Sequence, residues 1–224
     1  MKDYKELSRI EFNKQAEKFD TAKNNCYELC QDSYDPANDE IKKVPFNDFL
    51  DIGCGTGNTI EMLLKDFPNA NYTGIDLAEK MIEVAKKKVQ HDNVEFIVGD
   101  AENLPFEDNK YDVIICKESV HHYPNPEAFF KECNRVLRPN GRLIIVDMKV
   151  NAAFRAFWNK VLFPYLIKMG DCHVFNEDEI KKLYADYGFG DVSYRALPKM
   201  RFISVGFKKV EKTVTDPILS VKEN

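Results

Sequence analysis

The sequence lacks the features that mark secreted, membrane-spanning and nucleic-acid-binding proteins. No apolar run approaches the roughly 20 residues that cross a bilayer, and Met1–Glu6 lacks the apolar core of a signal peptide. Lysine and arginine (32) are outnumbered by aspartate and glutamate (37), so the net charge is −5 and no basic field exists for a phosphate backbone. We expect a soluble, cytoplasmic protein that binds no nucleic acid and does not span a membrane.

Cysteine and histidine are present but form no recognisable metal or disulfide pattern. The six cysteines are scattered without a C-x-x-C pair, and Cys26 and Cys30 are simply one helical turn apart. Of the four histidines, His121 and His122 are adjacent and are expected to point apart on a regular element. The sequence therefore predicts reduced, mostly buried thiols and no metal site.

What the sequence does contain is a regular alternation of short apolar runs and helical patterns. Its 224 residues, 44% of them apolar, suit one α/β domain with additions. Continuous apolar runs such as Val113–Ile115 indicate a parallel sheet covered on both faces. Strands are predicted near 47–52, 71–76, 94–98, 111–116, 141–147, 192–196 and 202–208.

A glycine-rich turn lies at the centre of this pattern. The strand-like Phe49–Ile52 is followed by Gly53, Gly55 and Gly57 and then by the helical Thr59–Leu64. Glycine allows positive φ and close approach of a ligand, and the helix start offers unpaired N–H groups. The turn is typical of a nucleotide-binding element, although any tight strand-to-helix connection can use glycine.

Two residues of this segment narrow the choice of ligand. A dinucleotide fingerprint, G-x-G-x-x-G, that begins at Gly53 requires a third glycine where this chain has Asn58. Asp51 places a carboxylate at the strand end, where it would repel a pyrophosphate and hold an ammonium group. Both residues disfavour an NAD-linked oxidoreductase and predict a ligand with a cationic end.

Acidic residues also follow the next two strands. Asp76 can bind both ribose hydroxyls of a nucleoside, or can cap the helix predicted at 78–90. Asp100 can accept a hydrogen bond from an adenine amino group while the Ala101 N–H donates to a ring nitrogen, or it can be a turn residue. Because the carboxyl ends of parallel strands share one edge of a sheet, we expect a single site.

Five segments in order resemble the class I S-adenosylmethionine-dependent methyltransferases, and the chain is most similar to the small-molecule group with the ubiquinone and menaquinone C-methyltransferases. The segments are D-I-G-C-G-T-G at 51–57, G-I-D-L-A-E-K-M-I at 74–82, G-D-A-E-N-L-P-F at 99–106, Y-D-V-I-I-C at 111–116 and N-R-V-L-R-P-N-G-R-L-I-I-V-D at 134–147. The resemblance implies a Rossmann-like three-layer sandwich, with a mostly parallel seven-stranded sheet, an antiparallel C-terminal hairpin and helices on both faces.

The resemblance also implies S-adenosyl-L-methionine as cofactor and transfer of its methyl group to a small, partly apolar acceptor. The alternative is a sensor or scaffold that binds S-adenosylmethionine without turnover, since it would have the same pocket. The backbone carbonyl of Lys117 would receive the ammonium group, and Leu77 and Met81 would lie against the adenine or pack in the core. The expected cofactor-binding residues are Asp51, Gly53, Gly55, Gly57, Asp76, Leu77, Met81, Asp100, Ala101 and Lys117.

The acceptor is expected beside the segment that follows the fourth strand. Glu118, His121 and Tyr123 are predicted to face it, and His121 is the candidate catalytic residue because its ordinary pKa lies near neutrality. Histidine in a loop can equally be a structural hydrogen-bonding residue. No motif identifies the acceptor atom.

Three further segments complete the predicted organisation. Residues 1–45 form an N-terminal helical lid that ends in a turn at Asp32–Asp39, and by the resemblance Phe19 and Tyr4 are lid residues. The domain itself covers 46–210, and 211–224 is a polar tail.

An apolar stretch at 151–175 is predicted to cap the strand ends. It leaves no clean polar face, and Pro164 is expected to interrupt its helix. Phe157 and Trp158 would then face the acceptor. A contact between two copies in a homodimer explains the same pattern.

Overall fold

Seven strands form one mixed sheet in the computed structural model, which describes residues 2–21, 31–167 and 169–210. Cys26, Cys30 and the predicted polar tail 211–224 lie outside the described residues. The strands are β1 (Asp48–Ile52), β2 (Asn71–Asp76), β3 (Val94–Val98), β4 (Tyr111–Lys117), β5 (Leu137–Met148), β6 (Phe189–Leu197) and β7 (Arg201–Lys208).

The strand order is β3-β2-β1-β4-β5-β7-β6. β1 to β5 pair in parallel, and β7 lies antiparallel between β5 and β6. The predicted Rossmann-like sheet with its C-terminal hairpin is therefore confirmed. Because the order reverses between β1 and β4, the crevice that binds ligands in such sheets opens at the carboxyl end of β1.

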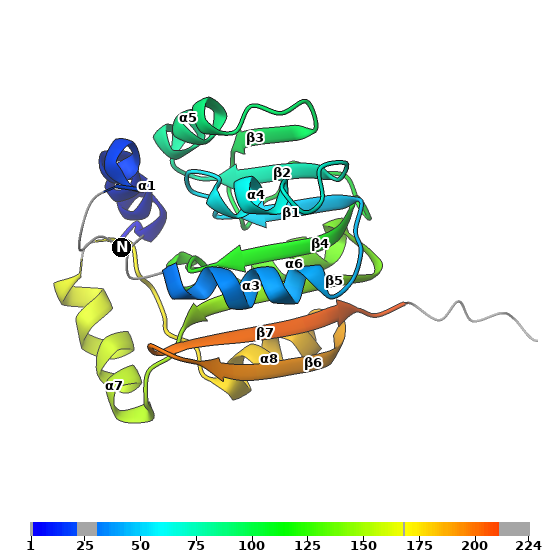
Figure 1. The fold of residues 1–224 in the computed structure, drawn as a ribbon. Helices are drawn as coiled ribbons and strands as arrows, with labels where there is room; N and C mark the ends of the chain where they lie inside the picture. Colours follow the sequence, from blue (N-terminus) through cyan, green and yellow to red (C-terminus); the bar gives the residue numbers. More distant parts are fainter. Residues whose placement is uncertain (1, 22–30, 168, 211–224) are drawn as a thin grey trace, which may run out of the picture.

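Helices cover both faces of the sheet (Figure 1). α3, α4 and α5 contribute to the core on one face, and α6 and α8 to the core on the other. α1 and α7 lie toward the edge where the parallel strands end (Figure 1). The helices are α1 (Tyr4–Gln15), α3 (Tyr34–Lys42), α4 (Asn58–Leu63), α5 (Glu79–Lys88), α6 (Pro126–Val136), α7 (Ala152–Phe157) and α8 (Glu177–Asp186).

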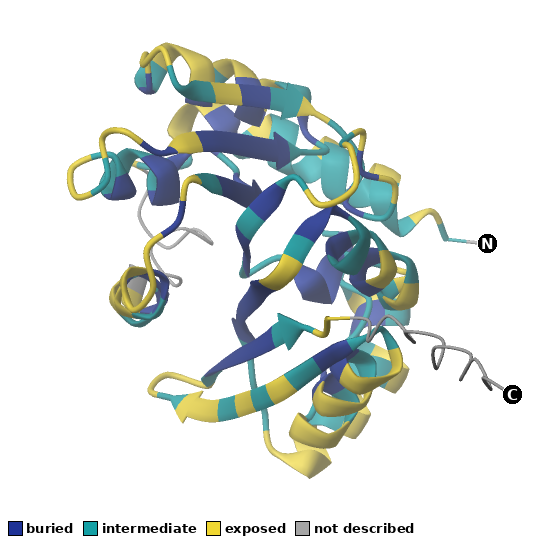
Figure 2. Cartoon of the chain, turned by 90° about the vertical axis from the view of Figure 1, so that its right-hand side faces the viewer, coloured by how far each residue is buried: buried dark blue, intermediate teal, exposed yellow. Residues whose placement is uncertain are grey.

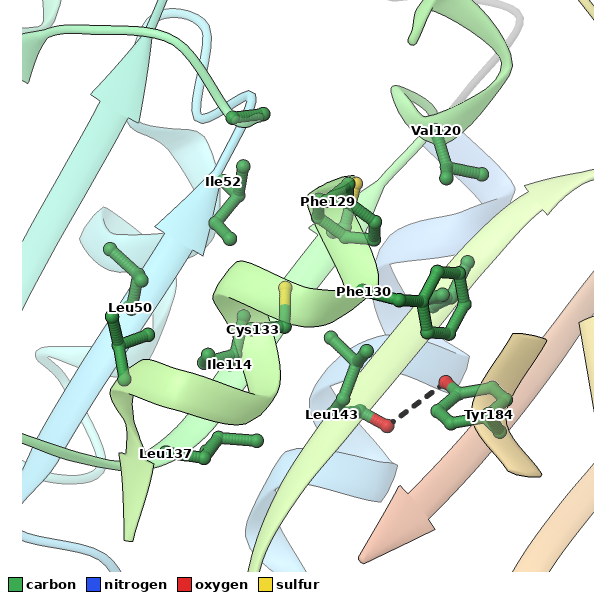
Figure 3. Close-up of a cluster of buried hydrophobic side chains, with 14 of the residues drawn as sticks. Leu50, Ile52, Ile114, Val120, Phe129, Phe130, Cys133, Leu137, Leu143 and Tyr184 are labelled. Atoms are coloured by element: carbon green, nitrogen blue, oxygen red, sulfur yellow. Dashed lines mark hydrogen bonds between the residues drawn. The ribbon is translucent and has the colours of Figure 1, made fainter. Parts of the chain in front are cut away.

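The inner strands are almost fully buried, whereas the outer helix surfaces are exposed (Figure 2). On the face covered by α6 and α8, Phe129 and Phe130 pack against the sheet together with Tyr184 (Figure 3). The Tyr184 hydroxyl donates to the backbone carbonyl of Leu143, 3.1 Å away, so its only polar side-chain atom is satisfied inside the core. This packing fixes β4 and β5 from one face of the sheet.

Residues 32–39, predicted to be a turn, instead form the end of a 3₁₀ turn, Gln31–Ser33, and the first part of helix α3, which begins at Tyr34. Pro36 lies in its first turn, where a missing N–H costs nothing because that group has no helical acceptor. Ala37 and Ile41 are fully buried and belong to the core cluster on this face of the sheet. The prediction failed because turn-forming residues are also the residues that favour a helix start.

Arg142 on β5 fastens the end of α3. Its buried guanidinium, 3% exposed, donates to the backbone carbonyls of Glu40, Ile41 and Val44. Such carbonyls at a helix end have no helical donor, so a cation beside them is doubly favourable.

Replacing Arg142 with methionine is expected to lower the free energy of unfolding by roughly 3 kcal/mol, because buried carbonyls lose their donors. Urea unfolding measures the loss. The matched control is Arg138→Met on the same strand, where the arginine is 39% exposed and pairs with Asp48 and Asp112; we expect a change of at most about 1 kcal/mol there. Equal losses in the two variants would contradict the capping role.

The apolar stretch after β5 forms α7 and continues without a break as π-helical turns over Trp158–Leu166, with Pro164 inside them. The expected interruption at Pro164 was therefore wrong, since the chain follows a wider helical path there. Tyr165 and Leu166 are mostly exposed. Among the described residues every helix is too short or too polar to cross a bilayer.

Candidate active site

A cavity of about 270 Å³ opens at the carboxyl ends of β1, β2 and β4. Its wall is completed by α1 and by the segment after the π-helical turns, which contributes Ile167 and Met169. The predicted residues that line it are Asp51, Gly53, Gly55, Asp76, Leu77, Met81, Asp100, Ala101, Lys117, Glu118, His121 and Tyr123. Residues from distant motifs are thus brought to one place.

Three predicted site residues lie outside the cavity wall. Gly57 has φ +79°, and a Cβ there would stand 2.7 Å from the Phe96 ring, so this glycine serves packing behind the loop. Phe157 is 48% exposed, and Trp158 packs on Phe163 with ring centroids 5.9 Å apart. The apolar cap reaches the cavity through its later residues instead of these two.

Asp51 presents a buried carboxylate to the cavity. It is 2% exposed, and its Oδ2 has no hydrogen-bond partner among the described residues. Burial raises its pKa to about 7, against the lowering effect of the Lys117 charge. An unpaired buried carboxylate oxygen is costly, so this position suits a ligand that brings a cation.

Asp76 joins β2 to the glycine loop. One carboxylate oxygen accepts from the Gly55 N–H at 2.9 Å and the other from the Ala78 N–H at 2.8 Å. Burial raises its pKa. Each oxygen keeps a further lone pair, so the carboxylate can still accept from a pair of hydroxyl groups.

Asp100 is engaged by the N-terminal helix. Lys5 of α1 places its Nζ 2.7 Å from Asp100 Oδ2 and 2.5 Å from Glu102 Oε2. Phe12 and Phe19 from the same region also line the cavity, and Tyr4 is not among its lining residues. The sequence indicated an amphipathic helix here but did not reveal the Lys5 contact.

The start of α4, which binds pyrophosphate in dinucleotide-binding proteins, is occupied by a carboxylate of the chain itself. Asp20 accepts hydrogen bonds from Thr56 and Asn58, at 2.7 and 2.9 Å, and lies 2.9 Å from Lys88 Nζ. Asp20 thus uses the side-chain donors of Thr56 and Asn58 and the charge of Lys88, which are then not available to an anionic ligand at that point. The arrangement agrees with the interpretation of Asn58 as evidence against a dinucleotide.

Two predicted acceptor-facing residues are tied to neighbours. Glu118 Oε1 lies 2.5 Å from Arg201 Nε, and both side chains line the cavity. The Tyr123 hydroxyl is 2.7 Å from Ser119 Oγ. Arg201 was not predicted, because its position on β7 becomes relevant only when the hairpin folds back beside β5.

His121 and His122 lie together, and the expectation that they point apart was wrong. They occupy a 3₁₀ turn, Val120–His122, in which their ring centroids are 4.1 Å apart. His121 Nδ1 is 2.6 Å from Asp147 Oδ1. Burial alone would lower the pKa of His121, but the charge and hydrogen bond of Asp147 outweigh it and raise the pKa to about 9.

Asp147 and Asp171 are two further residues on this side that were not predicted. Asp147 ends the last motif of the sequence and is positioned by β5, while Asp171 comes from the segment after the π-helical turns. The motif contained Asp147, but only the folded 3₁₀ turn reveals that it faces His121.

The comparisons with known proteins agree with this geometry. Residues 50–145 match the methyltransferase domain family. The chain is 30% identical over 167 residues to demethylmenaquinone methyltransferase of Thermotoga maritima, a match that spans 66% of this chain and 72% of that protein. The chain is a class I S-adenosylmethionine-dependent methyltransferase. S-adenosylmethionine is therefore its methyl donor.

Two other similarities place this methyltransferase more broadly. It is 38% identical over 108 residues to phthiotriol/phenolphthiotriol dimycocerosates methyltransferase of Mycobacterium tuberculosis, but this match spans only 48% of this chain and 40% of that protein. A chain in the complex of the Haloferax volcanii Trm112 methyltransferase activator with a methyltransferase superposes with a TM-score of 0.72. The two are 17% identical over 89% of this chain and 98% of that one. The second similarity shows the fold alone.

Proposed function

We propose that this methyltransferase acts on a small, partly apolar acceptor that binds beside His121 in the cavity that holds the methyl donor. The observation that carries the proposal is the division of the cavity wall. Its β1 and β2 ends carry Asp51 and Asp76, whereas the wall near His121 combines charged groups, Glu118 and Arg201 among them, with the apolar Met148 of β5 and the later Ile167 and Met169. Relatives named for demethylmenaquinone and for phthiotriol are consistent with an acceptor of this kind.

The residues present fit S-adenosylmethionine. The unpaired Oδ2 of Asp51 would accept from its ammonium group, and Asp76 would accept from the ribose hydroxyls. Gly55 leaves its side of the cavity open, since a Cβ there would meet no atom within 4 Å. Asp100 and Ala101 would bind the adenine edge, with Leu77 and Met81 beside the ring.

S-adenosylmethionine supplies a methyl group on a positively charged sulfur. This chain aligns the donor and the acceptor and excludes water from the cavity. Together these two contributions provide much of the rate enhancement in such displacements. Helix α1, fixed through Lys5, closes one side of the cavity as a lid. His121, oriented by Asp147, is the candidate to hold or exchange a proton at the acceptor.

A labelling experiment tests this function. Purified protein is incubated with methyl-labelled S-adenosylmethionine and fractionated metabolite extracts, and S-adenosylhomocysteine is measured alongside labelled product. We expect label in a low-mass, partly apolar fraction and an equal amount of S-adenosylhomocysteine. If calorimetry shows the donor bound while every fraction stays unlabelled, the scaffold alternative without turnover replaces this proposal.

A further inference from the structure

Two histidines and an aspartate from a distant segment meet on the acceptor side of the cavity. His121, His122 and Asp171 each offer one ligand atom, and these atoms all lie within 4.8 Å of one another. All three residues line the cavity. Methyl-donor binding does not explain the group, because the residues assigned to the donor's charged and ribose ends come from β1 and β2 instead.

One buried ring nitrogen of His122, Nδ1, has no hydrogen-bond partner among the described residues. In a neutral imidazole one nitrogen carries the hydrogen and the other presents a lone pair, so this ring can offer a lone pair to a ligand. The side chain is 8% exposed, so bulk solvent does not satisfy Nδ1.

Asp171 also has a buried polar atom without a hydrogen-bond partner among the described residues. This atom is its Oδ2, and its Oδ1 lies 3.8 Å from His121 Nε2. Buried polar atoms are nearly always paired, so two orphan atoms in one small group point to a missing ligand. A carboxylate oxygen is an electron-pair donor and an imidazole nitrogen can be one, so the ligand that fits these atoms is a cation or a hydrogen-bond donor.

His121 is arranged as metal-binding histidines are. Its Nδ1 is bound to the Asp147 carboxylate at 2.6 Å, which directs Nε2 toward Asp171. A carboxylate on the far nitrogen of a ligating histidine is the usual supporting contact, because it fixes ring orientation and strengthens the ligand. Asp147 is therefore a positioning residue in this group.

The backbone holds the two halves of the group together. The Cys172 N–H donates to the His121 carbonyl at 2.8 Å, and the His173 N–H donates to the same oxygen at 3.3 Å. Cys172 Sγ is 3.3 Å from the His122 carbonyl. Several hydrogen bonds thus hold the segment that carries Asp171 against the 3₁₀ turn. These bonds fix the relative positions of Asp171 and the two histidines.

The charges of the group leave room for a cation. Neither Asp147 nor Asp171 is paired with a lysine or arginine in the described part of the chain, whereas Glu118 is paired with Arg201. In the metal-free protein a protonated His121 faces Asp147, and a divalent ion bound at its Nε2 would replace that proton and balance the carboxylates of Asp147 and Asp171.

We propose that His121, His122 and Asp171 bind a divalent transition-metal ion such as Zn²⁺. Two imidazoles and one carboxylate are a ligand set of zinc sites that keep an open position. Ligand atoms around zinc lie roughly 3.4 Å apart, so the 3.8 Å between His121 Nε2 and Asp171 Oδ1 needs only a small inward rotation. The open position faces the cavity, where an oxygen or nitrogen of the acceptor can join. Because the ion takes the Nε2 lone pair of His121, in the metal-bound form His121 orients the acceptor through the ion and does not exchange a proton with it.

The test uses the untagged full-length chain, freed of metal with a chelator and dialysed. Zn²⁺ is titrated by calorimetry, and Co²⁺ is added as a spectroscopic probe. We expect one equivalent to bind, with visible cobalt absorption of a site without thiolate ligands. His122→Gln and Asp171→Asn should each weaken binding by at least about tenfold. His173→Gln is the matched control, because His173 lies on the same segment but faces Glu179, and should bind as the wild type does.

This experiment needs neither methyl donor nor acceptor, so its failure and the failure of the proposed function are distinguishable. If His122→Gln does not fold, judged by circular dichroism, Asp171→Asn decides, since it changes one atom and no hydrogen bond. The proposal is overturned if the wild type takes up no metal, or if a folded variant of His122 or Asp171 binds as tightly as the wild type.

Discussion

Replacing Asp51 with asparagine is expected to weaken S-adenosylmethionine binding by about 10³-fold, because the variant would leave the buried ammonium group without its counter-charge. The Asp51 carboxylate is 2% exposed and its Oδ2 is unpaired in the described part of the chain, so little else can take its place. Isothermal titration calorimetry at pH 8, where Asp51 is ionised, measures the loss.

The same substitution should stabilise the free protein. The pKa of Asp51 is raised from 3.8 to about 7, so the folded state binds more protons than the unfolded state between these pH values. The free energy of unfolding of the wild type therefore falls as pH rises through this window, and the penalty is complete above about pH 7. The difference corresponds to roughly 4 kcal/mol. Urea unfolding should show Asp51→Asn more stable than the wild type at pH 8 and nearly equal to it below pH 4.

A control on the same strand separates the site from a general effect of charge. Asp48 lies at the other end of β1, where it pairs with Arg138 at 2.8 Å. Asp48→Asn should bind the methyl donor as the wild type does. Unchanged donor affinity in Asp51→Asn, or equal losses in both variants, would remove Asp51 from the cofactor site.

Asp51 favours donor binding but destabilises the free protein. An acid of this kind stands out in an apolar strand, and for that reason the functional strand ends could be predicted from the sequence. An acid in a strand that is otherwise continuous and apolar is unfavourable for folding, and Asp51 and Asp76 both break the apolar pattern at such a point. The predicted ranges of β1 to β4 agree with the structure to within a residue because parallel buried strands are uniformly apolar, and that of β7 does too. By contrast, β5 begins four residues earlier than predicted and β6 is longer at both ends. Local patterns thus sufficed for the sheet and for the glycine loop.

Residues that depend on the path of a single turn could not be predicted in this way. From the sequence we expected the side chains of His121 and His122 to point apart, but the 3₁₀ turn brings their rings together. Asp171 is 50 residues away from His121 in sequence and reaches it through backbone contacts of the next two residues. Hydrophobic periodicity cannot predict this contact, since neither segment is a regular strand or a long helix.

The N-terminal region shows a related limit. Its amphipathic pattern predicted a helix on the domain, and α1 is such a helix. The pattern did not identify Lys5 as the residue that reaches Asp100 and Glu102, because the long side chain leaves the helix surface and pairs with acids almost a hundred residues away. Apolar periodicity locates an element and its buried face, but not its polar partners.

Substitutions at two nearby glycines of the loop are expected to have different effects, one on donor affinity and the other on stability. Gly55 and Gly57 both have positive φ, +53° and +79°. A Cβ at Gly55 would meet nothing within 4 Å, whereas one at Gly57 would stand 2.7 Å from the Phe96 ring. Gly55 lines the cavity and Gly57 does not. The space beside Gly55 is therefore available to the methyl donor.

Gly55→Ala is expected to lower donor affinity by about 10²–10³-fold, because the added methyl group occupies space that the bound donor needs. Its stability should fall by only about 1–2 kcal/mol, the cost of a left-handed backbone with a side chain. Gly57→Ala should show the reverse pattern: a loss of roughly 3 kcal/mol from strain and overpacking, with donor affinity of the folded fraction unchanged. Calorimetry and thermal unfolding of both variants measure the two effects. Donor binding by Gly55→Ala within about threefold of the wild type would mean that the methyl donor does not approach the loop here.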